Sequence, residues 1–452
     1  MQPHTVAELS NRIAGEVITS ASAAYDALRN VVNGAGSPAA IVRVQTTEDI
    51  VATIRFAREH RLALSVRSGG HAFTGLATNN DGLVLDLTPL NTVQVLDPER
   101  HLVRVGAGAR WGDVATALAS HGLAISSGDT RQVGVGGLTL GGGIGWMVRK
   151  YGLTIDSLVA AEVITADGRT VRVSAQEHPD LFWAIRGGGG NFGVVTSFDF
   201  HAQPVREIVA GSVNYDPAEA ETVLANWASS MCEAPEELNS TIVLFPGFGP
   251  QVPPRVTVLL CYAGDDEAQA NAAIKPFLQL GAVQSQDIQR KAYAAILEDA
   301  VSPPPTVKIV SHGGFLKSLS TEAVAALAAN YGQAGKPIAQ IRALGGAVAR
   351  VNSEATAFAH RENEALAVVL AFAPKDAPEE QAQQMRQAIW QPLAPFANGA
   401  YLNFESDASA ATVAAAYPGI TYARLAGIKA TYDPENIFNQ NQNIKPAAYT
   451  QE

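Results

Sequence analysis

The chain has 452 residues, of which 47% are hydrophobic and 17% are charged. This length predicts two or more units that each bury a core, and the composition is that of a folded chain, not a disordered one. The net charge of −11 argues against a nucleic-acid partner, because a phosphate backbone attracts basic surfaces.

Cysteine and hydropathy patterns exclude further classes. Only Cys232 and Cys261 are present, so neither a disulfide framework nor a zinc cluster is expected. The first residues lack the basic region and apolar core of a secretory signal. No apolar stretch approaches the ~20 residues of a membrane span. We therefore expect a cytoplasmic protein without a membrane partner.

The first predicted helix opens at a capping box. Thr46 and Asp49 have the required spacing, and the apolar residues that follow predict a helix to about His60. The apolar run 62–66 then predicts a strand.

A loop of sequence Arg67-Ser68-Gly69-Gly70-His71 follows that strand. Two adjacent glycines let backbone N–H groups approach an anion, and the histidine would lie beside the ligand. Taken alone, the segment is more commonly explained as a glycine turn with an incidental histidine.

Two hairpins and a helix are predicted next. Residues 93–96 and 102–105 form the first pair of strands, and 111–119 a short helix. Around Asp167-Gly168 we expect a second hairpin, since that dipeptide supplies the positive φ angles of a tight turn.

The second glycine cluster spans residues 134–145 and contains seven glycines in twelve residues. Because glycine loses the most backbone entropy on folding, we expect neither a packed helix nor a regular strand here. Such backbone suits contact with a pyrophosphate or a flavin edge. The alternative is a flexible linker, which the interleaved large apolar residues argue against.

The third glycine cluster, at residues 186–196, satisfies the dinucleotide fingerprint GxGxxG through Gly188, Gly190 and Gly193. That fingerprint follows a strand and opens a helix. Here a predicted helix precedes it and a predicted strand, 194–200, follows it. We therefore reject a Rossmann site, and no phosphate-binding P-loop motif occurs.

From about residue 206, longer helices alternate with strands. Residues 268–280 and 379–396 are expected to form amphipathic helices, and 255–262 and 366–372 strands. This mixture predicts an α+β fold with helices on one face of a largely antiparallel sheet. A last helix should stop at Asp433-Pro434, before a loop-rich tail.

At the three glycine clusters the sequence resembles the berberine bridge enzyme-like branch of the vanillyl-alcohol oxidase superfamily. The matching segments are RSGGH (67–71), VGVGGLTLGGGIG (133–145), YGLTIDSL (151–158), DLFWAIRGGGGNFGVVT (180–196) and KATYDPENIFNQNQNIKP (429–446). Chain length and the early RSGGH are also similar to bacterial members of the 6-hydroxy-D-nicotine oxidase type.

The resemblance implies a PCMH-type, two-subdomain FAD-binding domain and a substrate domain with an antiparallel sheet covered by helices. The FAD-binding domain would take residues 1–205 and, as a C-terminal return, 405–452. The substrate-binding domain would take residues 206–404.

The resemblance also implies that FAD is bound covalently through His71. Many relatives make a second bond through a cysteine at the position of Thr130, where a hydroxyl cannot replace a thiolate, so one bond is expected. Val133 matches a position that gates oxygen access, and valine there is similar to the oxidase form. Asn441 and Asn443 resemble residues that approach the flavin, or else they cap a turn. The other expected cofactor contacts are Arg67, Ser68, Gly69, Gly70, Gly134, Gly137, Leu138, Gly141, Gly142, Gly143, Gly145, Gly193 and Val195.

The implied activity is an FAD-dependent oxidase that moves hydride from a C–OH or C–N bond of a small substrate to the flavin, which O2 reoxidises to give H2O2. The alternatives are a dehydrogenase with another acceptor and a flavin-binding protein without catalysis.

The proton acceptor of the family is missing from this chain. Relatives place it on the second tyrosine of a YxNY motif, where this chain has Phe404. An amine bound already neutral would need little base assistance. Otherwise Gln340, Arg342 or His312 could substitute, or Tyr401 could point inward. Each has a structural alternative: a surface charge for Arg342, a loop residue for His312 and a core ring for Tyr401.

Overall fold

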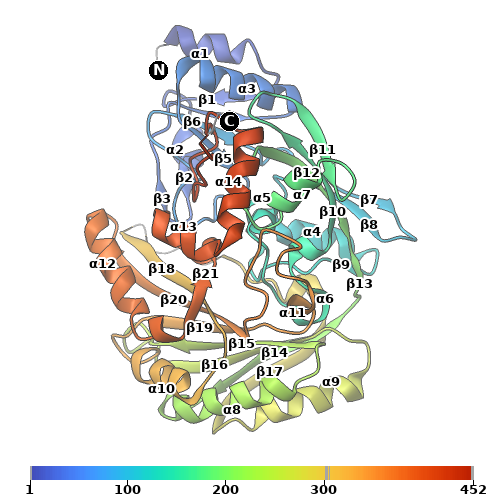
Figure 1. The fold of residues 1–452 in the computed structure, drawn as a ribbon. Coiled ribbons are helices and arrows are strands. Elements are labelled where there is room, and N and C mark those ends of the chain that lie inside the picture. Colours follow the sequence, from blue (N-terminus) through green and yellow to red (C-terminus); the bar gives the residue numbers. More distant parts are fainter. Residues whose placement is uncertain (1–2, 301–303, 305, 449–452) are drawn as a thin grey trace.

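The computed structural model describes residues 3–300, 304 and 306–448. In Figure 1 two smaller sheets with their helices form the upper part of the molecule, and one large sheet forms the lower part. No helix in these ranges combines the length and the apolar character that crossing a membrane requires.

The first sheet has the strand order β1-β4-β6-β5, with β4, β6 and β5 parallel to one another. Helix α3 (Thr47–His60) contributes Ile50, Ile54 and Phe56 to the core that this sheet shares. Its predicted capping box is present, because Thr46 accepts from the Asp49 backbone and Asp49 accepts from the Thr46 backbone. The strands are β1 (Glu16–Ile18), β4 (Ala40–Arg43), β5 (Leu64–Arg67) and β6 (Leu83–Asp86).

The second sheet is antiparallel, with the order β11-β10-β12-β8-β7. Both predicted hairpins occur in it, and the predicted helix at 111–119 is α4 (Trp111–Ala119). Its strands are β7 (Val93–Asp97), β8 (Leu102–Gly106), β10 (Leu158–Ile164), β11 (Thr170–Ser174) and β12 (Val194–His201).

The turn of the second hairpin differs from the prediction. Gly168 has φ +83°, but Asp167 is not among the residues with positive φ. The loop is longer than two residues, and the Asp167 carboxylate accepts hydrogen bonds from Thr165 and Arg169 instead. Hydrogen bonds of the Asp167 carboxylate therefore stabilise this turn, and only Gly168 of the dipeptide adopts a left-handed conformation.

The expectation of no helix in the second glycine cluster is wrong for six residues. Helix α5 (Val135–Leu140) forms with Gly134 as its N-cap. Val135 and Thr139 are fully buried, and a Cβ on Gly136 would lie 3.1 Å from the Ala107 oxygen. Close tertiary packing thus outweighs the entropy cost of glycine here.

The third sheet is antiparallel, with eight strands in the order β17-β14-β16-β15-β19-β20-β18-β21. Helices α8 (Ala220–Glu233), α9 (Glu267–Ile274), α10 (Thr321–Asn330) and α12 (Glu379–Trp390) share one core with it, which confirms the predicted layer of helices. The strands are β14 (Ile208–Tyr215), β15 (Leu238–Phe245), β16 (Arg255–Tyr262), β17 (Val283–Lys291), β18 (Val307–Leu316), β19 (Ile338–Ala343), β20 (Ala365–Pro374) and β21 (Ala397–Ala400).

Both helices predicted in this region end earlier than expected. After α9 and α12 the chain continues as 3₁₀ turns, at Lys275–Leu278 and Ala394–Phe396, and each turn contains a proline near its start. Pro276 and Pro392 each stand two residues after these helices end, and proline lacks the backbone donor that would continue the α-helical ladder.

The C-terminal segment returns to the first two sheets. Helices α13 (Ala410–Ala416) and α14 (Ile420–Tyr432) supply Val413, Leu425 and Tyr432 to the core of the N-terminal half, and α14 ends at the predicted Asp433-Pro434. The shorter elements are α1 (Pro3–Ser10), α2 (Tyr25–Leu28), α6 (Val148–Tyr151), α7 (Pro179–Ala184), α11 (Ala347–Arg350), β2 (Asn30–Val31), β3 (Gly34–Ala35), β9 (Leu123–Ala124) and β13 (Gln203–Pro204).

Candidate cofactor and substrate cavity

A cavity of about 1370 Å³ lies between the glycine clusters and the face of the third sheet that carries no helices. All three clusters, the C-terminal segment and six strands of the third sheet contribute to its wall. Single-ligand pockets usually have ~300–1,000 Å³, so this cavity has room for a large cofactor together with a substrate.

The loop after β5 brings two glycine clusters into direct contact. Ser68 Oγ donates to the Ala107 oxygen at 2.6 Å and accepts from the Gly136 nitrogen at 3.3 Å. A Cβ on Gly69 would lie 2.3 Å from the Gly134 nitrogen, so only glycine permits this approach. Gly70, with φ +71°, then turns the chain into the cavity wall.

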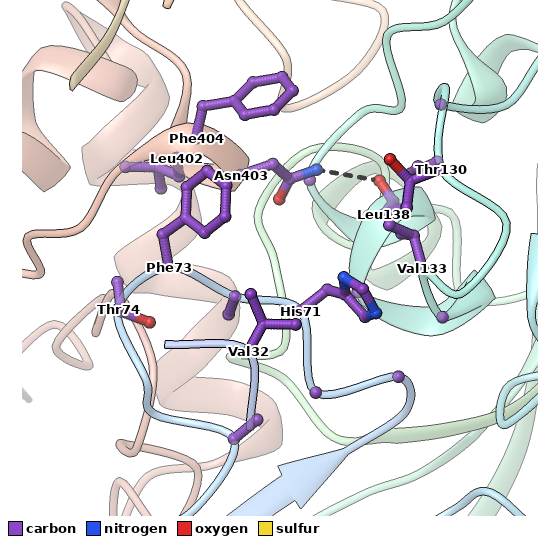
Figure 2. A pocket seen from close by; sticks show the side chains of 18 of the residues that line it. Val32, His71, Phe73, Thr74, Thr130, Val133, Leu138, Leu402, Asn403 and Phe404 are labelled. Atoms are coloured by element: carbon purple, nitrogen blue, oxygen red, sulfur yellow. Dashed lines mark hydrogen bonds between the residues drawn. The ribbon is translucent and has the colours of Figure 1, made fainter. Parts of the chain in front are cut away.

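His71 faces the centre of the cavity from this loop (Figure 2). Burial, together with the charge of Arg110, lowers the pKa of its imidazole. No hydrogen bond to its ring is found among the described residues. The ring is therefore neutral near pH 7 and has a free nitrogen lone pair, which is what a nucleophile requires.

Thr130, Val133 and Leu138 form the wall to one side of His71 (Figure 2). Thr130 Oγ1 donates to Asp129 Oδ1 at 3.0 Å. Neither cysteine of the chain lines the cavity, since Cys232 is exposed on α8 and Cys261 is buried in β16. A thiol is therefore absent from the wall that the structure describes.

Two glycines leave open space at the cavity wall. A Cβ on Gly137 or on Gly190 would meet no atom within 4 Å, so these positions expose bare backbone to the cavity. Gly193 differs from these two glycines because its surroundings are crowded. A Cβ there would lie 2.6 Å from the Ile164 oxygen, so only glycine fits. Bare backbone beside free space is a cradle that fits a flat, extended group such as a flavin nucleotide.

Most of the predicted cofactor contacts line this cavity. They are Ser68, Gly69, Gly70, His71, Thr130, Val133, Gly134, Gly137, Leu138, Gly141, Gly193, Val195 and Asn441. Asn441 Nδ2 donates to the Gly190 oxygen at 3.1 Å, while its buried Oδ1 has no partner among the described residues.

Five of the predicted contacts are not in the lining. Arg67 is buried in an ion pair with Asp86 at 2.9 Å. Gly142 and Gly143 have positive φ angles of +126° and +82° behind the wall, and a Cβ on Gly145 would collide with the Ser127 oxygen. The fifth is Asn443. These residues shape the loops from behind and do not face the cavity.

Arg342 and Gln340 meet at the sheet side of the cavity. Arg342 donates to Asp129 Oδ2 at 2.6 Å and to Gln340 Oε1 at 2.8 Å, and its guanidinium lies 4.9 Å from the centre of the Phe404 ring. Burial opposes ionisation of Asp129, but the charge and hydrogen bond of Arg342 outweigh it and lower the pKa of that carboxyl. Arg342 is thus a buried ion-pair partner and not a surface charge.

Tyr401 lines the cavity but its hydroxyl is occupied. The oxygen accepts from the Gly143 nitrogen at 3.1 Å and from Asn403 Nδ2 at 3.0 Å. Burial raises the pKa of this phenol. A phenol in this setting is a poor proton acceptor at neutral pH.

His312 does not line the cavity. Its ring packs on Trp390 with centroids 4.1 Å apart, and Nδ1 lies 3.1 Å from Glu405 Oε1. Burial and the charge of Arg386 lower the pKa of His312 to about 3. It belongs to a buried polar cluster beside the cavity.

Sequence reasoning missed three acidic residues of the wall, Asp129, Glu298 and Asp299. Asp129 precedes Thr130 directly and could have been found by its position. No motif marks Glu298, which reaches Thr130 only through the fold, by a backbone bridge.

The sheet side of the cavity is mostly apolar. Along β20, alternate residues face opposite sides, so Val368, Leu370 and Phe372 line the cavity while Ala367 and Val369 pack against the helices. Further apolar residues of this wall are Val243, Phe245, Leu259, Val307, Ile309 and Ile338, and its uncharged polar residues are Ser212, Asn214, Thr257 and Gln340.

Comparison with known proteins gives two family matches. Residues 38–174 match an FAD binding domain, and residues 400–445 match the domain described as berberine and berberine like.

Two sequence relatives cover almost the whole chain. It is 32% identical to an uncharacterized FAD-linked oxidoreductase, YgaK, of Bacillus subtilis, over 96% of this chain and 98% of the relative. It is also 32% identical to (R)-6-hydroxynicotine oxidase of Paenarthrobacter nicotinovorans, over 96% of this chain and 97% of the relative.

A solved structure has the same fold. The crystal structure of 6-hydroxy-D-nicotine oxidase from Arthrobacter nicotinovorans superposes with a TM-score of 0.85 at 29% identity, covering 96% of this chain and 98% of the other.

Proposed function

Because the chain belongs to the berberine bridge enzyme-like family of FAD-linked oxidoreductases, we propose that it is an oxidase of small molecules whose FAD is attached through His71 alone. The family assignment confirms the expected PCMH-type fold and FAD as the cofactor. The bound FAD supplies the redox chemistry, namely acceptance of hydride from a substrate C–N or C–OH carbon and reoxidation by O2 to give H2O2.

The proposal that FAD is attached to His71 rests on one observation. The neutral, unpartnered ring of His71 faces the same cavity as the bare backbone of Gly137 and Gly190. The glycine backbone would hold the cofactor, and the free imidazole nitrogen would form the covalent bond. A single bond is proposed because Thr130 has no thiol and neither cysteine reaches the wall.

The substrate would bind against the third sheet. Its wall of valine, leucine, isoleucine and phenylalanine side chains favours a small substrate with an apolar body. An oligosaccharide would leave many hydroxyl groups without partners there, which costs binding free energy for each buried group. We therefore propose an apolar or aromatic amine or alcohol as the substrate.

The domain division is part of the same proposal. Residues 1–205 and 405–452 would bind FAD, and residues 206–404 would bind the substrate. The shared core of the N-terminal half with Leu425 and Tyr432 of α14 supports this return of the chain.

The attachment is tested by denaturing the purified protein. Yellow colour that stays with the polypeptide is expected for the wild type, and release or loss of colour for His71→Ala. His121→Ala, a change at an exposed histidine, is the matched control and should keep the colour. Colour that is released from the wild type would contradict covalent attachment.

The oxidase activity is tested by anaerobic reduction and then exposure to air. Reoxidation in seconds with release of H2O2 supports an oxidase, whereas a flavin that stays reduced indicates a dehydrogenase. The substrate panel contains benzylamines, benzyl alcohols and chitobiose. No reduction by any compound would favour a binding protein without catalysis.

A further inference from the structure

The cavity needs a proton acceptor that the predicted candidates do not supply. Phe404 has no titratable group, and the Tyr401 hydroxyl accepts two hydrogen bonds. Arg342 is charged and bound to Asp129, which in turn is occupied on both oxygens. His312 lies outside the lining.

Glu298 lines the same cavity and is held beside Thr130. Its backbone nitrogen donates to the Asp129 oxygen at 2.8 Å, and its backbone oxygen accepts from the Arg131 nitrogen at 2.8 Å. These two bonds form a bridge that fixes Glu298 next to the residue at the second flavin-attachment position of the family. The main chain is thus anchored while the side chain is free.

The carboxylate of Glu298 has no hydrogen-bond or ion-pair partner in the part of the chain that the structure describes. This distinguishes it from its neighbours, because Asp129 binds Arg342 and Thr130, and Asp299 accepts from Gln132 at 2.9 Å. Glu298 is therefore an unsaturated acceptor on the cavity wall.

The charges around Glu298 increase its affinity for a proton. Glu298 is exposed at the wall, but its carboxyl is partly removed from water. This partial desolvation, followed by repulsion from Asp129, raises the pKa of the carboxyl, and Arg342 opposes the shift. The other charged or titratable groups among the described lining residues are Asp299, Arg255, His71, Tyr401 and Tyr417. A carboxylate with a raised pKa is a stronger base than an ordinary glutamate.

We infer that Glu298 is the general base that takes the N–H or O–H proton of the substrate, in place of the tyrosine that Phe404 replaces. The inference rests on the proposed oxidase function. In the step, the substrate carbon loses its hydrogen with two electrons as hydride to FAD, and Glu298 takes the proton from the heteroatom. The C–N or C–O single bond becomes a double bond, and the carboxylic acid then returns its proton to water.

The test compares Glu298→Gln with Glu298→Asp and with Glu362→Gln, the same change at an exposed glutamate outside the cavity lining. Anaerobic stopped-flow reduction by the best compound of the panel is followed from pH 5 to pH 10. In Glu298→Gln the rate of flavin reduction should fall about 10²–10⁴-fold. The decrease of this rate toward low pH, seen in the wild type, should also disappear. Glu298→Asp should restore part of the rate and its decrease toward low pH, and Glu362→Gln should stay close to the wild type.

A second measurement does not depend on turnover. Difference infrared titration of the holoenzyme should show a carboxyl band that titrates above the range of an ordinary glutamate and is missing in Glu298→Gln. Wild-type rates and an unchanged pH profile in Glu298→Gln would overturn the inference about Glu298 but leave the proposed oxidase function intact. An infrared titration identical in the wild type and in Glu298→Gln would have the same consequence. Failure of every compound to reduce the wild-type flavin would overturn the proposed function, and the inference with it.

Discussion

The Tyr401 hydroxyl lies 3.1 Å from the Gly143 nitrogen and accepts its hydrogen bond. This contact joins the segment after β21 to the second glycine cluster, where Gly143 has φ +82°. The phenol thus satisfies a buried backbone donor at a left-handed turn. Its geometry gives Tyr401 a structural role at the cavity wall.

Tyr401→Phe should therefore lower stability without removing the proton acceptor. The buried Gly143 N–H would lose its partner, which costs about 1–3 kcal/mol in the free energy of unfolding. Urea unfolding measures this loss, and Tyr422→Phe, a change at a partly buried tyrosine, is the control. Loss of the pH dependence of flavin reduction in Tyr401→Phe would instead identify this phenol as the base.

Gly137→Leu should block the cofactor while leaving the fold intact. Gly137 has open space where the side chain would go, and that space is the cavity. Flavin bound per polypeptide, measured by absorbance, should fall at least tenfold. Gly427→Leu is the matched control, since this exposed glycine of helix α14 also has no atom within 4 Å of its Cβ position. Equal flavin content in the two variants would contradict the cradle.

Thr130→Cys should create a second attachment point. Thr130 and His71 line the same cavity (Figure 2), and a thiolate at position 130 would be nucleophilic where the hydroxyl is not. The double variant His71→Ala/Thr130→Cys should keep yellow colour on denaturation, whereas His71→Ala alone should not. A double variant that binds flavin in its native state but loses the colour on denaturation would show that the Cys side chain at position 130 does not reach the flavin ring.

Stability should depend on pH through Glu405. This fully buried carboxyl contacts His312 and Arg386, and burial raises its pKa to about 8. Between the unfolded pKa of about 4.3 and pH 8 the folded state therefore holds a proton that the unfolded state has lost. The stabilisation is complete below about pH 4 and is lost as the pH rises through 8, by up to ~1.4 kcal/mol per pH unit.

Melting temperatures of the wild type and Glu405→Gln between pH 5 and pH 9 test this dependence. The wild type should lose stability over this range relative to Glu405→Gln, which keeps a neutral side chain throughout. Glu362→Gln, at an exposed glutamate, should follow the wild type. Parallel curves for all three proteins would mean that Glu405 is ionised in the folded state.

The parts of the fold with local signals were predictable from the sequence. The capping box of Thr46 and Asp49 and the stop at Asp433-Pro434 depend on neighbouring residues only, and both occur as expected. Helix α5 was not predictable in this way. Its glycines are tolerated because backbone from a distant loop packs against them, and intrinsic helix propensity cannot register that contact.

In the candidate site, too, residues that belong to local motifs were predictable, whereas residues placed only by the fold were not. The glycine clusters and His71 follow from motifs, and His71 and most of the predicted glycines line the cavity. Glu298 has no motif, because its place beside Thr130 depends on a bridge between segments far apart in the chain. His312, a predicted candidate, is on a strand as expected but packs against Trp390, outside the lining, which the pattern of polar residues could not reveal.

The buried ammonium group of Lys429 holds the part of the cavity wall that comes last in the chain. It donates to the Asn191 oxygen at 2.7 Å and the Phe438 oxygen at 2.9 Å, and it pairs with Asp433 at 2.7 Å. These bonds tie the third glycine cluster to the tail, whose residues 440–442 close the cavity. These are the last residues of the lining that a ribosome makes, so a nascent chain has the complete wall only after synthesis has passed residue 442.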